Sequence, residues 1–359
     1  MNPDAAHLAE IGWPPAPPAE WRALQAGHPA ARPARVVEQH RSGYVVAEAA
    51  GDAQAVESLP EWMRPRLDPN LRAAVGDWVL VEDAPVRPRI VALLPRRSLI
   101  KRAAAGEHYR QQLIAANVDT AFVVTGLDGD FNPRRIERYL LLLQGGGVEP
   151  VVVLTKQDIA EDAEGAISAL AGVAAQGVAI IRLDARDDDG AAQLARWLEP
   201  GRTVVLVGSS GAGKSTLTNT LLGEARMKTG AVRAHDARGR HTTTHRALIA
   251  LPSGACLIDT PGMRELKPTG EEQLDIAAFA DIESLARGCR FRDCRHDREP
   301  GCALRAVIES GALEPARLAN YLKLRDEHAI AGDVLANRQA GRPAAALPGG
   351  RRHGGRHKR

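Results

Sequence analysis

The sequence of 359 residues predicts an α/β domain with a parallel sheet and a phosphate-binding loop, preceded by a small β-barrel and followed by a helical, metal-binding segment. Three observations lead to this prediction. Short β-type runs separated by Gly, Pro, Asp and Asn fill residues 35–105. From about residue 117, near-continuous Val/Ile/Leu runs alternate with helical patterns. Three cysteines and one histidine lie close together between residues 289 and 302.

The bulk composition is that of an ordinary globular protein. Apolar residues make up 44% of the chain and charged residues 25%, while the net charge is only +3. The start, MNPDAAHLAE, has neither a basic region nor an apolar stretch, and no apolar run is long enough to cross a bilayer. We therefore expect a cytoplasmic protein without membrane contact, in which clustered cysteines bind metal instead of forming disulfides.

Five segments are expected along the chain. They are a flexible Pro- and Ala-rich extension (1–34), an OB-fold-like barrel (35–110), the α/β domain (111–280), a zinc-binding domain (281–338) and a basic disordered tail (339–359). The barrel strands are expected at 35–37, 43–47, 76–81 and 89–94. OB barrels often bind nucleic acid, although a barrel without that role fits the sequence equally well.

The α/β domain is predicted from alternating element types. Strands are expected at 118–126, 151–155, 178–183 and 203–207, and helices at 134–144, 167–175 and 191–198. Because the strands are apolar on both faces, their sheet should be parallel and covered by helices on both sides.

A phosphate-binding loop follows the strand TVVLV. It fits the pattern G-x-x-x-x-G-K-[ST] at every fixed position. Its glycines let backbone N–H groups converge on phosphate oxygens, the helix N-terminus adds its positive dipole end, Lys214 adds a full charge, and Ser215 can bind Mg²⁺. The candidate phosphate-binding residues are Gly208, Ser209, Ser210, Gly211, Ala212, Gly213, Lys214, Ser215 and Thr216.

Two further segments are expected to meet magnesium and the terminal phosphate. The apolar run 255–259 leads into Asp-Thr-Pro-Gly, in which Asp259 can hold Mg²⁺ through water and the Gly262 N–H can face a γ-phosphate. The loop GRHTTTH lies before this run. A threonine in this loop can bind Mg²⁺ through its hydroxyl, and we assign this role to Thr243, although Thr242 and Thr244 fit the same pattern.

A base-recognition motif, Thr155-Lys156-Gln157-Asp158, follows the strand VVVL. The Asp158 carboxylate can accept hydrogen bonds from N1–H and the exocyclic amine of guanine, whereas adenine has no matching pair of donors. The Lys156 stem can cover the flat face of the base. These residues predict binding of GTP and GDP, and a strand-end turn with surface charges is the alternative.

The Cys/His cluster has the spacing C-x4-C-x-H-x5-C. Three sulfurs and one imidazole form a closed tetrahedral set, so Cys289, Cys294, His296 and Cys302 predict one structural zinc ion. Cys256 lies in an apolar strand, and we expect it to be part of the core.

The nucleotide motifs resemble the G4, G1, G2 and G3 elements of regulatory GTPases, in that unusual order along the chain. With the barrel before them and the Cys/His cluster after them, residues 35–335 resemble the RsgA (YjeQ) family of circularly permuted P-loop GTPases. There are two departures. Thr155 replaces the more common asparagine, and Leu183-Asp184-Ala185 stands where a Ser-Ala element is usual.

The resemblance also has implications for hydrolysis and partners. Met263 stands where many GTPases have a water-orienting glutamine. The resemblance implies that His241, just before the threonine run, positions the attacking water; a solvated loop histidine is the alternative. It further implies binding to the 30S ribosomal subunit and its 16S rRNA, with subunit-stimulated GTP hydrolysis driving release during late maturation.

Two basic segments are candidates for contact with RNA phosphates, the tail and the residues after the last barrel strand. They contain Arg342, Arg351, Arg352, Arg356, Lys358 and Arg359, and Arg96, Arg97, Lys101 and Arg102. A solvated tail is the alternative. For the whole protein, we expect a monomer, and two other classes stay open: a P-loop ATPase or kinase, and an RNA-binding zinc and barrel module with a purely structural nucleotide site.

Overall fold

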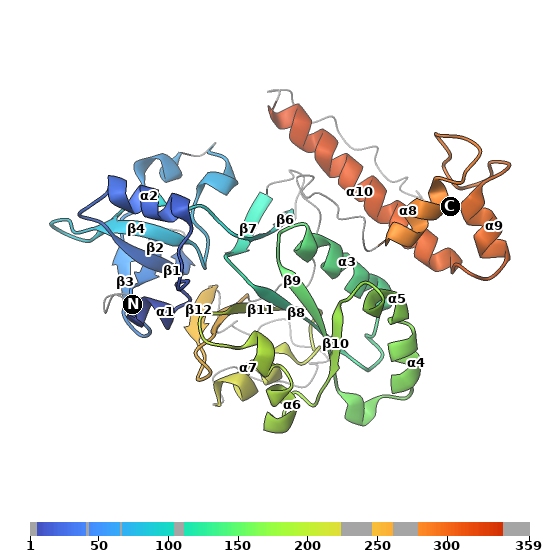
Figure 1. The fold of residues 1–359 in the computed structure, drawn as a ribbon, viewed down its shortest axis with the longest axis horizontal. Coiled ribbons are helices and arrows are strands. Elements are labelled where there is room, and N and C mark those ends of the chain that lie inside the picture. The colour runs from blue at the N-terminus through green and yellow to red at the C-terminus, as the bar shows by residue number, and fades with distance from the viewer. Residues whose placement is uncertain are drawn as a thin grey trace, which may run out of the picture.

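The α/β domain forms the centre of the molecule, with the N-terminal barrel and the C-terminal helices on its two flanks (Figure 1). The computed structural model describes residues 6–40, 43–64, 67–103, 111–223, 246–260 and 279–339. Within these ranges, none of the helices combines the length and the apolar character that a membrane span requires.

The barrel consists of five antiparallel strands, β1 Arg32–His40, β2 Gly43–Ala47, β3 Ala53–Val56, β4 Trp78–Glu82 and β5 Arg89–Leu93. They pair in the order β3-β2-β1-β4-β5, and Glu57 after β3 pairs with Arg89 of β5, which brings the two end strands together. Every second residue of a strand points inward, as Val79 and Val81 of β4 do. A five-stranded barrel of this kind has the OB-fold architecture. Two short 3₁₀ turns, Pro60–Met63 and Pro69–Leu71, connect β3 to β4.

The first residues of the described chain are packed, which corrects our expectation of a flexible extension over 1–34. Two helices, α1 Ala6–Ala9 and α2 Ala19–Gly27, precede β1. Trp13 and Trp21 are buried against Trp78 of β4, with ring centroids 4.7 and 6.3 Å from it. Burial of these large aromatic rings stabilises the ordered form of this Pro-rich segment.

Among the described residues, the central sheet has six strands in the order β10-β9-β8-β11-β13-β12, of which only β12 runs antiparallel to its neighbour β13. They are β8 Thr120–Gly126, β9 Glu149–Thr155, β10 Ala179–Arg182, β11 Thr203–Val207, β12 Ala247–Ala250 and β13 Cys256–Asp259. The helices are α3 Pro133–Gln144, α4 Ala163–Ser168, α5 Ala171–Ala174, α6 Asp188–Ala192 and α7 Lys214–Leu222, with 3₁₀ turns at Gln157–Ile159 and Ala195–Trp197.

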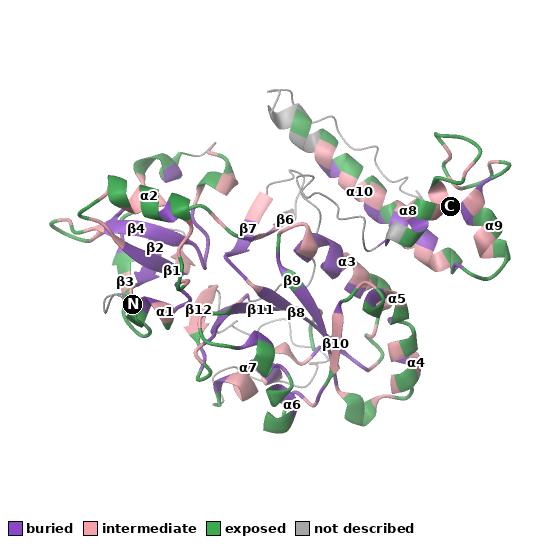
Figure 2. Ribbon diagram, viewed as in Figure 1, coloured by how far each residue is buried: buried purple, intermediate pink, exposed green. Residues whose placement is uncertain are grey.

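Helices cover both faces of this sheet, so its central strands are buried (Figure 2). On one face, Val123 and Val205 pack with α3, α4 and α5. On the other, Phe122 and Val204 pack with α7 and with Trp197 of the 3₁₀ turn after α6. Neighbouring residues of one strand thus enter different cores, which explains the unbroken apolar runs in the sequence.

The barrel and the central sheet are joined by hydrogen-bonded strands. Ala247 of β12 pairs with Glu38 of β1 on one side and with Asp259 of β13 on the other. A separate two-stranded sheet, β6 Leu99–Ala103 with β7 Gln111–Ala116, connects β5 to β8 along the chain.

Arg96, one of the basic residues considered for RNA contact, binds the segment that precedes β4 and is mostly buried there. Its guanidinium lies 2.7 Å from the fully buried carboxylate of Asp77. It also donates to the backbone oxygen atoms of Asn70 and Arg72. A guanidinium with these partners holds loops together and is not available to a phosphate, so we withdraw Arg96 from the candidate RNA-binding residues.

Residues 279–339 form three helices, α8 Ala280–Ala286, α9 Ala303–Glu309 and α10 Pro315–Gln339. Their core includes Ile282, Leu304 and Tyr321, together with Leu141 of α3. Polar contacts support the same interface, because Asn320 of α10 donates to Glu137 of α3 at 2.8 Å. Helix α3 is therefore shared between the central sheet and the C-terminal helices.

Candidate nucleotide and metal sites

The phosphate loop connects β11 to α7. Gly211 and Gly213 have φ angles of 81° and 94°, which favour glycine. A Cβ on Gly208 would lie 2.1 Å from the Val124 carbonyl oxygen, so this glycine lets the loop approach β8 closely. Lys214 begins α7, and its ammonium donates to the Gly208 carbonyl oxygen at 2.9 Å. The structure thus places a curled, glycine-rich backbone and a lysine at a helix N-terminus, the arrangement that binds phosphate.

Thr155 holds the base motif against this loop. Its side chain is fully buried, and its hydroxyl donates to the carbonyl oxygen of Ala212 at 2.7 Å. A Cβ on Gly213 would lie 3.2 Å from the same hydroxyl. Only β8 separates β9 from β11 in the sheet, and parallel strands end at the same edge. Two motifs 57 residues apart therefore meet, and threonine makes a link to the phosphate loop where asparagine is more common.

The charged residues of the base motif have partners from other loops. Lys156 has a φ of 59°, and its ammonium donates to Asp128 at 2.6 Å. Gln157 and Asp158 are exposed in the 3₁₀ turn after β9, and the Asp158 carboxylate accepts from Arg186 at 3.0 Å. The motif is thus tied to the protein at three points while its carboxylate stays open to solvent.

A loop after β8 contributes residues that the sequence reading missed. Asp128 binds Lys156, and the Asp130 carboxylate accepts from Ser209 of the phosphate loop and from Arg135 of α3. Burial opposes the charge of Asp130, yet these donors hold its pKa below the usual value. The sequence did contain a signal for this loop. Ligands of parallel sheets bind at the carboxyl ends of the strands, and β8 lies between the two strands that carry motifs.

Asp259 ends β13, next to the phosphate-loop strand. Burial raises the pKa of its carboxyl, and the charge of Lys214 acts in the opposite direction. The structure thus brings this carboxylate, the lysine and the start of α7, with Ser215 and Thr216, into one region. His241, Thr243, Gly262 and Met263 lie outside the described residues, so their assignments stay predictions.

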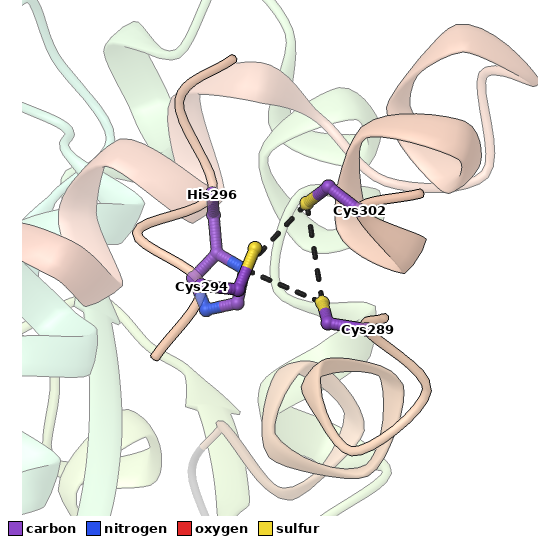
Figure 3. A group of neighbouring side chains, drawn as sticks. All are labelled: Cys289, Cys294, His296 and Cys302. Atoms are coloured by element: carbon purple, nitrogen blue, oxygen red, sulfur yellow. Dashed lines mark hydrogen bonds between the residues drawn. The ribbon is translucent and has the colours of Figure 1, made fainter. Parts of the chain in front are cut away.

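The four metal-ligand candidates come together between α8 and α9 (Figure 3). Their ligand atoms, from Cys289, Cys294, His296 and Cys302, all lie within 4.8 Å of one another. Both Cys289 Sγ and Cys302 Sγ are 3.6 Å from His296 Nδ1, and the two sulfurs are 4.0 Å apart. A tetrahedral zinc site requires about 3.6 Å between S and N and about 3.8 Å between two S atoms, so these residues fit the ion.

The surroundings of Cys289 favour its thiolate form, which is the form that binds metal. Although burial raises the pKa of this thiol, hydrogen bonds from the backbone N–H groups of Ala303 and Leu304 bring it below its usual value. These N–H groups belong to the first turn of α9, where unpaired donors and the helix dipole stabilise a thiolate. The cluster can therefore hold a metal ion.

A base motif that precedes the phosphate loop in the chain but contacts it in space defines a circularly permuted P-loop GTPase fold. The solved structure of YjeQ from Thermotoga maritima matches with a TM-score of 0.57 at 24% identity, over 83% of this chain and 98% of that one. YloQ, described as a circularly permuted GTPase, matches with a TM-score of 0.54 at 22% identity, over 82% of this chain and 96% of that one.

Sequence comparison identifies the family. The model of the RsgA GTPase family matches residues 93–269. The small ribosomal subunit biogenesis GTPase RsgA of Xanthomonas euvesicatoria pv. vesicatoria (strain 85-10) is 64% identical over 94% of this chain and 93% of its own length. The protein of the same name from Xanthomonas oryzae pv. oryzae (strain PXO99A) is 63% identical over 95% of this chain and 93% of its length. The chain belongs to the RsgA GTPase family.

Proposed function

We propose that this protein is a GTPase that binds the small ribosomal subunit and acts in its late maturation. Curated relatives that align with nearly the whole chain carry a name that states a role in small-subunit biogenesis. Within the molecule, the proposal depends on one observation, the hydrogen bond from Thr155 to Ala212. It joins a base-reading motif and a phosphate loop into one nucleotide site.

The proposed nucleotide lies along the carboxyl edge of the central sheet. Residues 208–216 hold its phosphates, and Lys214 adds its charge to the outer ones. Asp158 accepts the two donors on the guanine edge, which favours GTP over ATP because adenine would leave this carboxylate without them. Lys156, held by Asp128, places its aliphatic stem over the base.

The residues at the phosphate end fit a magnesium ion, since a serine hydroxyl and a carboxylate at adjoining strand ends are oxygen ligands of the kind it takes. Ser215 and Thr243 would bind Mg²⁺ directly, Asp259 would hold it through water, and the Gly262 N–H would face the γ-phosphate. The ion, when bound, neutralises charge that develops on the phosphates during transfer. We assign to His241 the positioning of the attacking water.

The C-terminal cluster holds one structural zinc ion in this proposal, because three cysteines and one histidine leave no coordination position for substrate. The partner is the 30S subunit, contacted at its 16S rRNA by the barrel and by the basic residues of 339–359. The GTP-bound protein, a monomer working in the cytoplasm where subunits mature, binds the subunit, and hydrolysis favours release.

GTP turnover with and without purified 30S subunits tests the proposal. We expect the subunit to stimulate turnover and excess ATP to leave it unchanged. Lys214→Ala should abolish hydrolysis, whereas Lys323→Ala, which removes an exposed lysine of α10, should not. Turnover that 30S leaves unaltered would contradict the role in the subunit cycle, and competition by ATP would favour a P-loop ATPase.

Two further measurements address the hydrolysis step and the release step. His241→Ala should slow single-turnover hydrolysis on the subunit, and an unchanged rate removes this histidine from the mechanism. The affinity for 30S should be higher with a non-hydrolysable GTP analogue than with GDP. Equal affinities would exclude release driven by hydrolysis.

A further inference from the structure

A guanidinium bridges two carboxylates at the base end of the nucleotide site. Arg186 Nη2 donates to Asp158 Oδ2 at 3.0 Å and to Asp184 Oδ2 at 2.6 Å. Asp158 follows β9 and Asp184 follows β10, which are neighbouring parallel strands, so their carboxyl ends lie at the same edge of the sheet. Arg186 is in none of the motifs that identify the nucleotide site.

Asp184 fixes the direction in which Arg186 points. Its Oδ1 accepts the backbone N–H of Arg186 at 2.9 Å and the Arg186 Nε at 2.9 Å, while its Oδ2 accepts Nη2. Such a fork-to-fork pair has one geometry, in contrast to the many positions open to a single ion pair. The same hydrogen bonds hold the pKa of Asp184 below its usual value.

The bridge has an electrostatic reason. Asp184 brings a second negative charge close to Asp158, since one nitrogen of Arg186 contacts both carboxylates. Without Arg186 the two carboxylates would repel each other, and Asp158 would turn away from its neighbour. With Arg186 in place, its guanidinium neutralises the charge of Asp184.

The bridge leaves Asp158 able to bind guanine. A carboxylate has about four lone-pair positions, and Arg186 uses one of them on Oδ2. Oδ1 and the remaining position on Oδ2 are available to the two donors of the guanine edge. The side chains of Arg186 and Asp158 are 63% and 46% exposed, so a base can reach them.

We propose that Arg186 is a positioning residue for base specificity: held by Asp184, it orients the Asp158 carboxylate toward the N1–H and exocyclic amine of a 2-amino-6-oxopurine. The proposal rests on the assignment of Asp158 as the base-reading residue.

Affinities for fluorescent GDP, and for IDP in competition, test the proposal, because inosine lacks the exocyclic amine. We expect Arg186→Ala to weaken GDP binding about tenfold, the size of one charge-assisted hydrogen bond, and IDP binding much less. The double variant Arg186→Ala/Asp184→Ser should regain most of the lost GDP affinity, because the repelling charge is gone. Arg182→Ala is the matched control, since Arg182 also ends β10 and pairs with Glu164 away from the base motif.

The variants separate the possible failures. An unchanged GDP-to-IDP ratio in Arg186→Ala would overturn the proposal. A double variant as weak as Arg186→Ala alone would also overturn it, since Arg186 would then act on the nucleotide itself. Asp158→Asn serves as the reference. If this variant leaves the GDP-to-IDP affinity ratio unchanged, Asp158 does not bind the base, and the proposed function at this position has failed independently of Arg186.

Discussion

Removing the guanidinium of Arg35 should destabilise the junction between the barrel and the central sheet. This side chain of β1 is fully buried. It donates to the carbonyl oxygens of Ile11 and Gly76 and, at 2.9 Å, to the hydroxyl of Thr203 at the start of the phosphate-loop strand. Its guanidinium also lies 5.3 Å from the ring centroid of Trp78. One cation thus ties together the N-terminal segment, the barrel and the central sheet.

The cost of Arg35→Met can be worked out from these contacts. Methionine keeps much of the apolar stem but donates no hydrogen bonds. Gly76 retains a second donor, the Asn117 amide at 3.1 Å. The acceptors on Ile11, Asn117 and Thr203 lose the guanidinium. Three buried acceptors at about 1–3 kcal/mol each, less the cost of burying a cation that methionine removes, give about 3 kcal/mol. Arg32→Met on the same strand should cost about 1 kcal/mol or less, because Arg32 makes partly exposed ion pairs.

Urea unfolding followed by tryptophan fluorescence measures this difference. Trp13, Trp21 and Trp78 lie in one cluster beside the junction, so they report its opening. We expect the transition of the Arg35→Met variant to shift to clearly lower urea with little change in slope, which marks a change in stability. A shift no larger than that of Arg32→Met would refute the idea that Arg35 is the link.

Three other predictions concern the nucleotide site, the metal and pH. Thr155→Val leaves the Ala212 carbonyl without its donor and should weaken GDP binding about tenfold by calorimetry, whereas Thr155→Ser should bind normally. Cys294→Ser should lower the zinc content from one ion per chain to none by elemental analysis, and unchanged content would contradict the proposed ligand set. Burial raises the pKa of Glu137, so its charged form is disfavoured in the folded protein, and stability should fall as pH rises through this carboxyl's titration. Between pH 4 and 7, the melting temperature should fall more steeply, or rise less, in the parent protein than in Glu137→Gln, since other buried carboxyls such as Asp259 titrate in both.

The features that could be predicted from the sequence depend on neighbouring residues. The phosphate loop is an example, because glycines at fixed spacing report a backbone conformation that few other residues adopt. The strand expected at 43–47 is β2, with the same bounds. In place of the helix expected at 191–198, the chain forms the short helix α6 and then the 3₁₀ turn Ala195–Trp197. Helix α6 begins at Asp188, because the Asp187 side chain accepts from the Asp189 N–H and caps it there.

Features that depend on distant partners could not be predicted. The Pro-rich start looked flexible because its two tryptophans stabilise it only by packing against Trp78, far along the chain. Arg96 looked like a surface cation, since nothing nearby in the sequence shows that Asp77 is buried beneath it. The partners of the base motif were missed for the same reason: the sheet, and no local pattern, brings Asp128 and Arg186 to it.

One strand, β12, separates Asp259 of β13 from the barrel strand β1, so the barrel lies close to the proposed nucleotide site. Glu38, Ala247 and Asp259 are paired side by side on three adjacent strands. Because adjacent strands are about 4.8 Å apart, the backbone of β1 is roughly 10 Å from that of β13. A displacement of the barrel by a bound partner would therefore be transmitted to β13 and Asp259 through the backbone hydrogen bonds of β12. In the described part of the chain, these three strands pair directly, without a flexible linker between them.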